Sequence, residues 1–143
     1  GVSLVILKAP PGCRASGAVI PHSGRPVILL SFRYLSDDHF WFTVFHEAGH
    51  LILHGASRLF IEGNGAIGEM EELEANNFAS NLLIPQEYRS ELEMLSAREW
   101  RKIIRFAKKV GVSAGIVVGQ LQYAGILSHA SLNNLKTRYR WSE

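Results

Sequence analysis

Two histidines and a glutamate lie within five consecutive residues, His46-Glu47-Ala48-Gly49-His50, which form the pattern H-E-x-x-H. On an α-helix, residues four apart lie on one face, about one turn from each other, so both imidazoles can reach the same metal ion. Histidine nitrogens bind Zn²⁺ at ~2.0–2.1 Å, and a glutamate beside the first ligand can take a proton from a metal-bound water. The pattern therefore predicts a zinc-dependent hydrolytic site, with His46 and His50 as ligands and Glu47 as general base.

A catalytic zinc site usually has three protein ligands, so a third must come from elsewhere. His54 follows His50 by four residues. Three ligands on one straight helix converge poorly on a tetrahedral centre, because each step of four residues rotates the side chain by about 40°. His54 is therefore predicted to lie beside the ligands, in the pocket, or to be simply a histidine at the helix C-terminus. The acidic residues that open the next helix are the better candidates: Glu69, Glu71, Glu72 and Glu74.

The apolar face of that second helix narrows the choice. At 100° per residue, Glu71 and Glu72 lie about 40–60° from the centre of this face, whereas Glu74 lies about 100° away on the other side. Helical geometry thus favours Glu71 or Glu72 as the third ligand and leaves both open. Asn76 is one turn beyond Glu72 and is predicted to orient a ligand histidine.

Short apolar runs predict the strands that support this site. Residues 3–8, 18–20 and 27–34 are rich in β-branched and aliphatic side chains. The turn residues at 22–26 join the last two runs into a hairpin. A further short strand is predicted at 58–61. The sheet is expected to be small and antiparallel.

Helix signals surround the chemical residues. A helix is predicted at 39–54, because Ser36 and two aspartates precede it and Gly55 follows it. A second helix is predicted at about 70–83, where Pro85 stops it. Further helices are predicted at about 97–109 and 113–124, with a last turn or two within 128–136. The fold class is therefore α+β, with the sheet packed on the H-E-x-x-H helix and the glutamate helix.

The distribution of charge divides the chain at about residue 85. The 143 residues carry a formal net charge of +2, with 47% hydrophobic and 20% charged residues, which is typical of a globular protein. Residues 1–85 carry a net charge of −3 and residues 86–143 one of +5. We expect a metallopeptidase-type core at 1–85 and a helical subdomain packed on it at 86–143. The single cysteine, Cys13, excludes an intrachain disulfide framework and is typical of a reducing compartment.

The segment 97–124 resembles a helix-turn-helix, the usual DNA-reading motif. A DNA-reading second helix exposes basic and polar side chains, but Ser113–Gln122 has no Lys or Arg. The segment is therefore predicted to be a packing unit, and direct nucleic-acid binding by this fragment is not expected. DNA binding through 97–124 stays the alternative.

The two chemical motifs together resemble the ImmA/IrrE family of zinc metallopeptidases. The family pattern H-E-x-x-H-x-x-x-H is present from His46 to His54, and E-x-x-A-N-x-F-A-x-x-L-L-x-P runs from Glu72 to Pro85. The resemblance implies a zincin-like fold, one Zn²⁺ per chain and Glu72 as the third ligand. Zincins usually add a donor for the oxyanion, for which His54, Tyr88, Tyr123 and His129 are the candidates.

The resemblance also implies a biological setting. Family members are intracellular bacterial or phage proteins, and several cleave a helix-turn-helix repressor. Others are fused to, or encoded beside, such DNA-binding domains, including antitoxin-like regulators. A sequence that starts without Met favours a piece of a longer protein with a preceding domain. We therefore expect a cytoplasmic endopeptidase that cleaves a repressor in a stress, phage or toxin–antitoxin circuit. The alternative is a non-catalytic regulatory module that retains the fold. No apolar run approaches the ~20 residues of a membrane span.

Overall fold

The computed structural model describes residues 1–55, 60–61 and 68–142. The chain divides into two compact units. The first unit comprises Gly1–Tyr34 and Phe42–Ala79, and the second comprises Leu35–Trp41 and Ser80–Glu143. The α+β class is as predicted, whereas a division at residue 85 stays a prediction. Within the described ranges, no helix is both long and apolar enough to cross a membrane.

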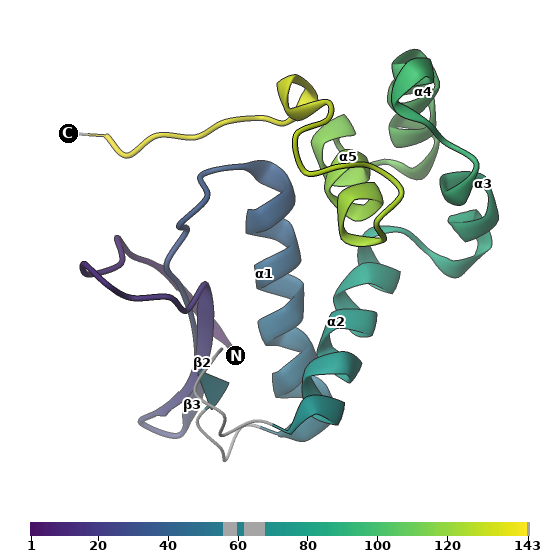
Figure 1. The fold of residues 1–143 in the computed structure, drawn as a ribbon. Helices are drawn as coiled ribbons and strands as arrows, with labels where there is room; N and C mark the ends of the chain where they lie inside the picture. Colours follow the sequence, from purple (N-terminus) through teal and green to yellow (C-terminus); the bar gives the residue numbers. More distant parts are fainter. Residues whose placement is uncertain (56–59, 62–67, 143) are drawn as a thin grey trace. The chain divides into compact units, whose positions relative to one another are not determined.

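The sheet of the first unit is built around the predicted hairpin (Figure 1). Strand β2 (Gly17–His22) and strand β3 (Arg25–Leu30) pair antiparallel, from Gly17 opposite Leu30 to His22 opposite Arg25. The two residues between them, Ser23 and Gly24, have φ angles of 48° and 76°. Both angles are positive, as a tight two-residue hairpin turn requires. The short strand β4 (Phe60–Ile61) pairs antiparallel with β2, so half of the strand predicted at 58–61 is present and residues 58–59 lie outside the described residues.

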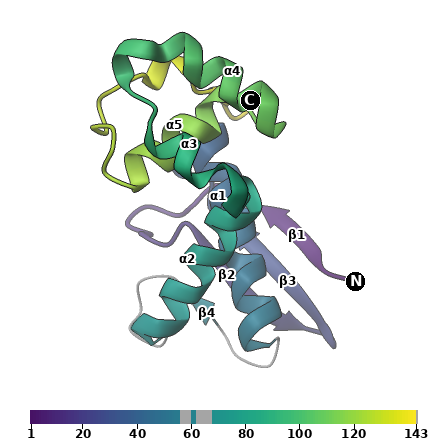
Figure 2. The same ribbon diagram turned by 90° about the vertical axis from the view of Figure 1, so that its right-hand side faces the viewer.

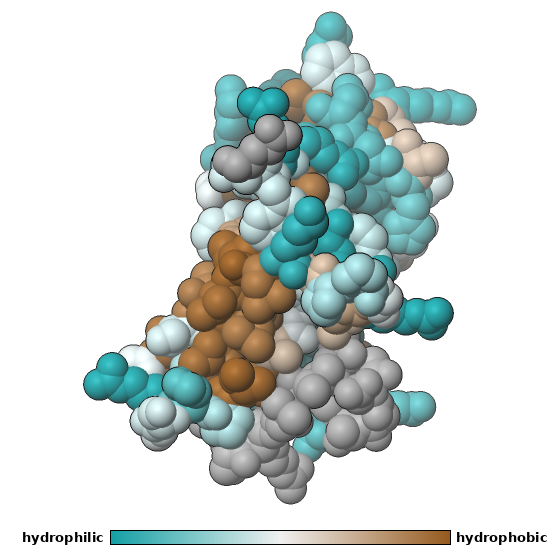
Figure 3. Space-filling view, turned by 90° about the vertical axis from the view of Figure 1, so that its left-hand side faces the viewer, coloured by the Kyte–Doolittle hydropathy of each residue, from teal (hydrophilic) through white to brown (hydrophobic). Residues whose placement is uncertain are grey.

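The prediction of a wholly antiparallel sheet was wrong, because strand β1 (Ser3–Ile6) pairs parallel with β3. The strand order is β1-β3-β2-β4, which puts β1 at one edge (Figure 2). The chain reverses direction twice between β1 and β3, so these two strands run the same way. Hydrophobic patterns predict strands but not their direction. All four residues of β1 are exposed, and an apolar patch is visible on this side of the molecule (Figure 3).

Helix α1 (Asp37–Gly49) carries the H-E-x-x-H motif and continues into a π-helical segment, η1 (His50–His54). The whole stretch ends at Gly55, as predicted, where φ is 87°. Helix α2 (Glu69–Leu83) is the predicted glutamate helix. Within the first unit, the part of α1 that carries the motif lies between the sheet and α2 (Figure 1). A Cβ at Gly49 would lie only 3.2 Å from the Cα of Ala75, so the two helices approach each other closely there.

The second unit is helical. The predicted helices at 97–109 and 113–124 correspond to η3 (Ala97–Glu99) with α4 (Trp100–Val110) and to α5 (Ala114–Tyr123). A single 3₁₀ turn, η4 (Asn133–Leu135), lies within the predicted 128–136. The turn η2 (Gln86–Tyr88) and helix α3 (Arg89–Glu93) were not predicted. The similarity to a helix-turn-helix stays a prediction.

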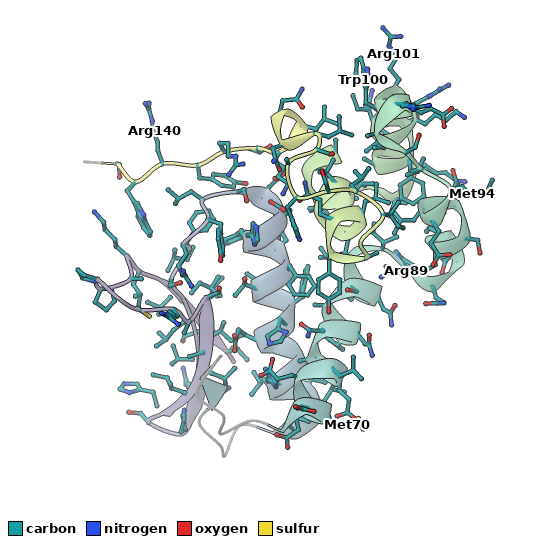
Figure 4. The ribbon with its side chains drawn as sticks, in the orientation of Figure 1. Met70, Arg89, Met94, Trp100, Arg101 and Arg140 are labelled. Carbon is teal, nitrogen blue, oxygen red and sulfur yellow. The ribbon has the colours of Figure 1, made fainter. Side chains whose placement is uncertain are left out.

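The two main helices of this unit differ in their exposure. Helix α5 is mostly buried, and its buried residues include Ile116, Val117, Val118 and Leu121. Helix α4 instead exposes its basic residues. At its first turn, the guanidinium of Arg101 lies 4.9 Å from the centre of the Trp100 ring (Figure 4). The Lys and Arg side chains exposed along α4 are Arg101, Lys102, Arg105, Lys108 and Lys109.

Two buried aspartates connect the first turn of α1 to the C-terminal segment of the same unit. Asp37 and Asp38 are 2% and 7% exposed. The backbone N–H of Thr137 donates to Asp37 Oδ1 at 3.0 Å, and Lys136 Nζ lies 2.7 Å from Asp38 Oδ2. Lys136 also donates to Gln122 Oε1 at 2.7 Å. These contacts satisfy carboxylates that would otherwise be costly to bury.

Candidate metal centre

Three side chains from two helices converge within the first unit. His46 and His50 come from α1 and the start of η1, and Glu72 comes from α2. Their ligand atoms all lie within 4.8 Å of one another. Among the described residues, these three form the one group of three or more His, Cys, Asp or Glu side chains that meets this condition. His46 and His50 are buried, and Glu72 is partly exposed, so the group has one side open to solvent.

The spacing of the donor atoms fits a tetrahedral cation. His46 Nε2 lies 3.0 Å from His50 Nε2. The two nitrogens lie 3.4 Å from different oxygens of Glu72, His46 Nε2 from Oε2 and His50 Nε2 from Oε1. For metal–ligand bonds of ~2.0–2.1 Å, the edge of a regular tetrahedron is about 3.3 Å. Two imidazoles and one carboxylate form a donor set typical of catalytic zinc, with a fourth position left for water. The residues present therefore fit a zinc ion.

The choice between the two adjacent glutamates follows from where each points. Glu72 faces both histidines, whereas Glu71 lies outside the group. Glu71 Oε2 instead accepts a hydrogen bond from the backbone N–H of Gly68, at 3.3 Å, at the start of α2. Glu71 thus satisfies a free N–H at a helix N-terminus, where a carboxylate is favoured.

Asn76 contacts the first histidine. Asn76 Oδ1 lies 2.9 Å from His46 Nδ1, one turn of α2 beyond Glu72. When His46 Nδ1–H donates to this oxygen, the lone pair of Nε2 is directed to the metal position. The sequence predicted an orienting role for this asparagine, and the contact has the required partner and length.

His54 lies beside the group and outside it. Its Nδ1 is 3.2 Å from His50 Nδ1, and its Nε2 is 2.9 Å from Glu74 Oε2. The prediction for His54 assumed that the α-helix continues straight to residue 54. Residues 50–54 are instead π-helical, and His54 still lies beside His50. The contact with Glu74 was not anticipated, because the helix-face argument turned that residue away from the interior.

Glu47 is held in a narrow space beside the sheet. It is 1% exposed, on the turn of α1 that carries both histidines. Gly17 of β2 adjoins it, since a Cβ at Gly17 would lie 2.7 Å from Glu47 Cγ and still closer to Oε1. Gly17 was not predicted from the sequence, because no local signal marks a glycine that must leave space for a distant side chain.

Burial controls the protonation of the second histidine. Burial, together with the neighbouring His46 and His54, lowers the pKa of His50 from 6.5 to about 4, although Glu71 acts in the opposite direction. A metal binds only the unprotonated imidazole. His50 is therefore neutral at pH 7 in the metal-free protein, as a ligand must be.

The other candidate oxyanion donors belong to the second unit. The ring of Tyr88 contacts Phe106 edge-on, with centroids 6.3 Å apart, and Lys109 Nζ lies 5.5 Å from its centre. Tyr123 and His129 are in the same unit. A role for any of these three in catalysis stays a prediction.

The sequence matches a known protein family over most of its length. The sequence model of a family described as Peptidase_M78, IrrE N-terminal-like domain, matches residues 4–122, which is most of the chain. No curated protein matches significantly. The matched range includes every residue of the group described above.

Proposed function

This chain belongs to the Peptidase_M78 family of IrrE N-terminal-like domains, and we propose that it is a zinc-dependent endopeptidase that hydrolyses a peptide bond in a protein substrate. The family supports a metallopeptidase. The zinc ion, the roles of the individual residues and the substrate are the proposal. Its ligands are His46, His50 and Glu72, and its general base is Glu47.

The observation that carries the proposal is the convergence of His46, His50 and Glu72 next to a buried carboxylate that is not one of the ligands. Glu47 lies on the same helix as both histidines and is 1% exposed. A carboxylate without a catalytic task is rarely kept so deeply buried beside an acidic ligand, because burying a charge is costly. A group of three protein side chains with Glu47 buried beside it supports a hydrolytic site over a purely structural zinc site, which has four protein ligands.

Each residue has a distinct part in the chemistry. His46, His50 and Glu72 would hold the zinc ion, which would supply Lewis-acid polarisation of the scissile carbonyl and activation of water. The carboxylate of Glu47 accepts a proton from the attacking water and later delivers it to the leaving amine nitrogen. Gly17 leaves the space in which Glu47 keeps this position, and Asn76 directs the imidazole of His46.

We propose a helix-turn-helix transcriptional repressor as the substrate, in a bacterial stress, phage or toxin–antitoxin circuit. This proposal is supported by the resemblance of both motifs to the ImmA/IrrE family, several members of which cleave such repressors. A fused or adjacent helix-turn-helix domain, and a cytoplasmic location, are parts of the same proposal.

The test combines metal content with proteolysis. We expect one zinc per chain in the purified protein and in Glu47→Gln, and loss of zinc in His46→Ala. Purified helix-turn-helix repressors from the same genome serve as substrates, with cleavage read by mass spectrometry. Cleavage should be abolished by Glu47→Gln and retained by the matched variant Glu87→Gln, which removes the same charge from an exposed site. A protein that fails to take up added Zn²⁺ would contradict the proposal.

The alternatives give different results. A non-catalytic regulatory module would regulate its target equally well with Glu47→Gln. A DNA-binding protein that uses 97–124 would bind duplex DNA with a strong dependence on salt. The burial of α5 supports a packing role for that segment, because a recognition helix must present its side chains to the groove.

A further inference from the structure

We propose that Glu74 and His54 are positioning residues that fix the tautomer of His50 and thereby direct its Nε2 lone pair to the metal. The inference rests on the metal site of the proposed function and adds two residues to it. Neither His54 nor Glu74 belongs to the group of three converging side chains.

The three imidazoles and the carboxylate form a continuous chain of contacts. Glu74 Oε2 lies 2.9 Å from His54 Nε2, and His54 Nδ1 lies 3.2 Å from His50 Nδ1. At the other end, His50 Nε2 lies 3.0 Å from His46 Nε2. Each of these distances is short enough for a hydrogen bond, in which one atom must donate and the other accept.

The carboxylate of Glu74 determines which atom donates in each of these hydrogen bonds. An ionised carboxylate only accepts, so His54 Nε2 carries the proton that it donates to Glu74. In the neutral form of His54, which has one N–H, Nδ1 is therefore an acceptor. His50 Nδ1 must then be the donor to it, which leaves His50 Nε2 with its lone pair directed to the metal position.

The opposite placement of the protons is incompatible with the contact between His54 and Glu74. If His50 Nε2 carried the proton, His50 Nδ1 would accept from His54 Nδ1–H. The unprotonated Nε2 of His54 would then face the carboxylate oxygen at 2.9 Å, and two acceptors would oppose each other. The other end of the chain has no such constraint. The amide of Asn76 can turn to donate to His46 Nδ1, so His46 Nε2 can carry a proton while the metal is absent.

Burial indicates how much each contact matters. The side chain of His54 is 8% exposed, whereas that of Glu74 is 52% exposed. Solvent therefore screens the charge of Glu74, and its main contribution is to accept one hydrogen bond. Loss of a partner that orients a ligand histidine typically lowers metal affinity by about 10–100-fold. We place His54 near the upper end of that range and Glu74 near the lower end.

The first test reads the tautomer in the metal-free protein. Two-bond ¹H–¹⁵N correlation of the histidine rings, in the complete chain treated with chelator, distinguishes Nδ1–H from Nε2–H. We expect His50 to carry its proton on Nδ1, and to lose this preference in His54→Leu. A wild-type His50 protonated on Nε2 would overturn the inference.

The second test uses variants of matched shape and measures Zn²⁺ affinity by competition with a chromophoric chelator. Asn and Leu are similar in shape, but only Asn keeps an acceptor near the place of the histidine Nδ1. His54→Leu should weaken zinc binding about 10–100-fold, and His54→Asn should restore most of it. Equal affinities for these two variants would show that His54 has only a packing role.

The same measurement applies to the carboxylate. Glu74→Ala should weaken binding about 10-fold, and Glu74→Gln, which keeps an acceptor, by less. The control is Glu69→Ala, which removes a charge from the first turn of the same helix. An effect of Glu69→Ala as large as that of Glu74→Ala would point to overall charge and contradict the inference. If the protein binds no metal, the proposed function fails, but the tautomer of His50 still decides this inference.

Discussion

Gly17 and Glu47 adjoin so closely that a Cβ on the glycine would lie 2.7 Å from Glu47 Cγ. One residue comes from the sheet and the other from the helix that carries both histidines. The position of Glu47, the proposed base, therefore depends on the absence of a side chain at Gly17 of β2.

Gly17→Ala is expected to displace Glu47 while leaving the metal ligands in place. The added methyl group overlaps Glu47, and a misplacement of about 1 Å can lower a rate by about 100-fold. The turnover number should therefore fall about 10–100-fold, with zinc affinity within about 3-fold of wild type. Gly68→Ala is the control, since a Cβ there meets no atom within 4 Å in the described part of the chain. A Gly17→Ala enzyme with full turnover would show that Glu47 tolerates displacement.

Glu72→Gln and Glu71→Gln should differ sharply in zinc binding. Both variants remove one charge from adjacent positions of α2, but only Glu72 faces both histidines. We expect Glu72→Gln to lose about 100-fold or more in affinity, and Glu71→Gln to lose little, because loss of a direct ligand costs at least as much as loss of an outer partner. Chelator competition measures both. Similar losses would return the assignment to the ambiguity left by the sequence.

The metal-free protein should lose stability as the pH falls from about 6.5 to about 4. His50 has a folded-state pKa of about 4, below its ordinary value of 6.5, because burial penalises the charged form. In this window the unfolded chain binds a proton that the folded protein does not, so acid favours unfolding. The stability is fully present above the unfolded pKa. Urea titrations across this range, in chelator, should show a smaller pH dependence for His50→Asn than for His22→Asn, which changes an exposed histidine.

Lys136→Met should destabilise the protein by about 3–5 kcal/mol, since it leaves the buried carboxylate of Asp38 without its charged partner. Burial alone would raise the pKa of Asp38, but hydrogen bonds from Lys136 and Ser36 lower it below its ordinary value. The stability from Asp38 is thus present above its unfolded pKa and is lost as the pH falls through the folded value. Thermal melting should show little change for Lys109→Met, which breaks an exposed pair with Glu91. Equal shifts in Tm for the two variants would contradict the argument.

Local signals were sufficient for most of the helices and for the hairpin. Ser36 and Gly55 bound the motif helix because capping residues act on adjacent backbone. The turn at Ser23 and Gly24 was visible because it needs positive φ angles, which few residues adopt readily. The π-helical form of 50–54 had no such signal, since the same side chains also form an α-helix.

Contacts between distant segments could not be predicted in the same way. The parallel pairing of β1 with β3 depends on how the chain returns, which the pattern of apolar residues does not encode. Helical periodicity left both Glu71 and Glu72 as candidates for the third ligand, and the family resemblance implied Glu72. In the structure Glu72 is the one that lies with the two histidines. The contact between Glu74 and His54 needs both helices to be placed first.

The contacts of the C-terminal segment determine how far the protein can be truncated for expression. The family match ends at residue 122, yet the backbone of Thr137 and the ammonium group of Lys136 bind the two aspartates at the start of α1, and Tyr139 donates its backbone N–H to Leu35. An expression clone trimmed to the matched range would keep every proposed ligand but strip two carboxylates of their partners. The contacts that hold the second unit together therefore reach residue 139, beyond the end of the family match.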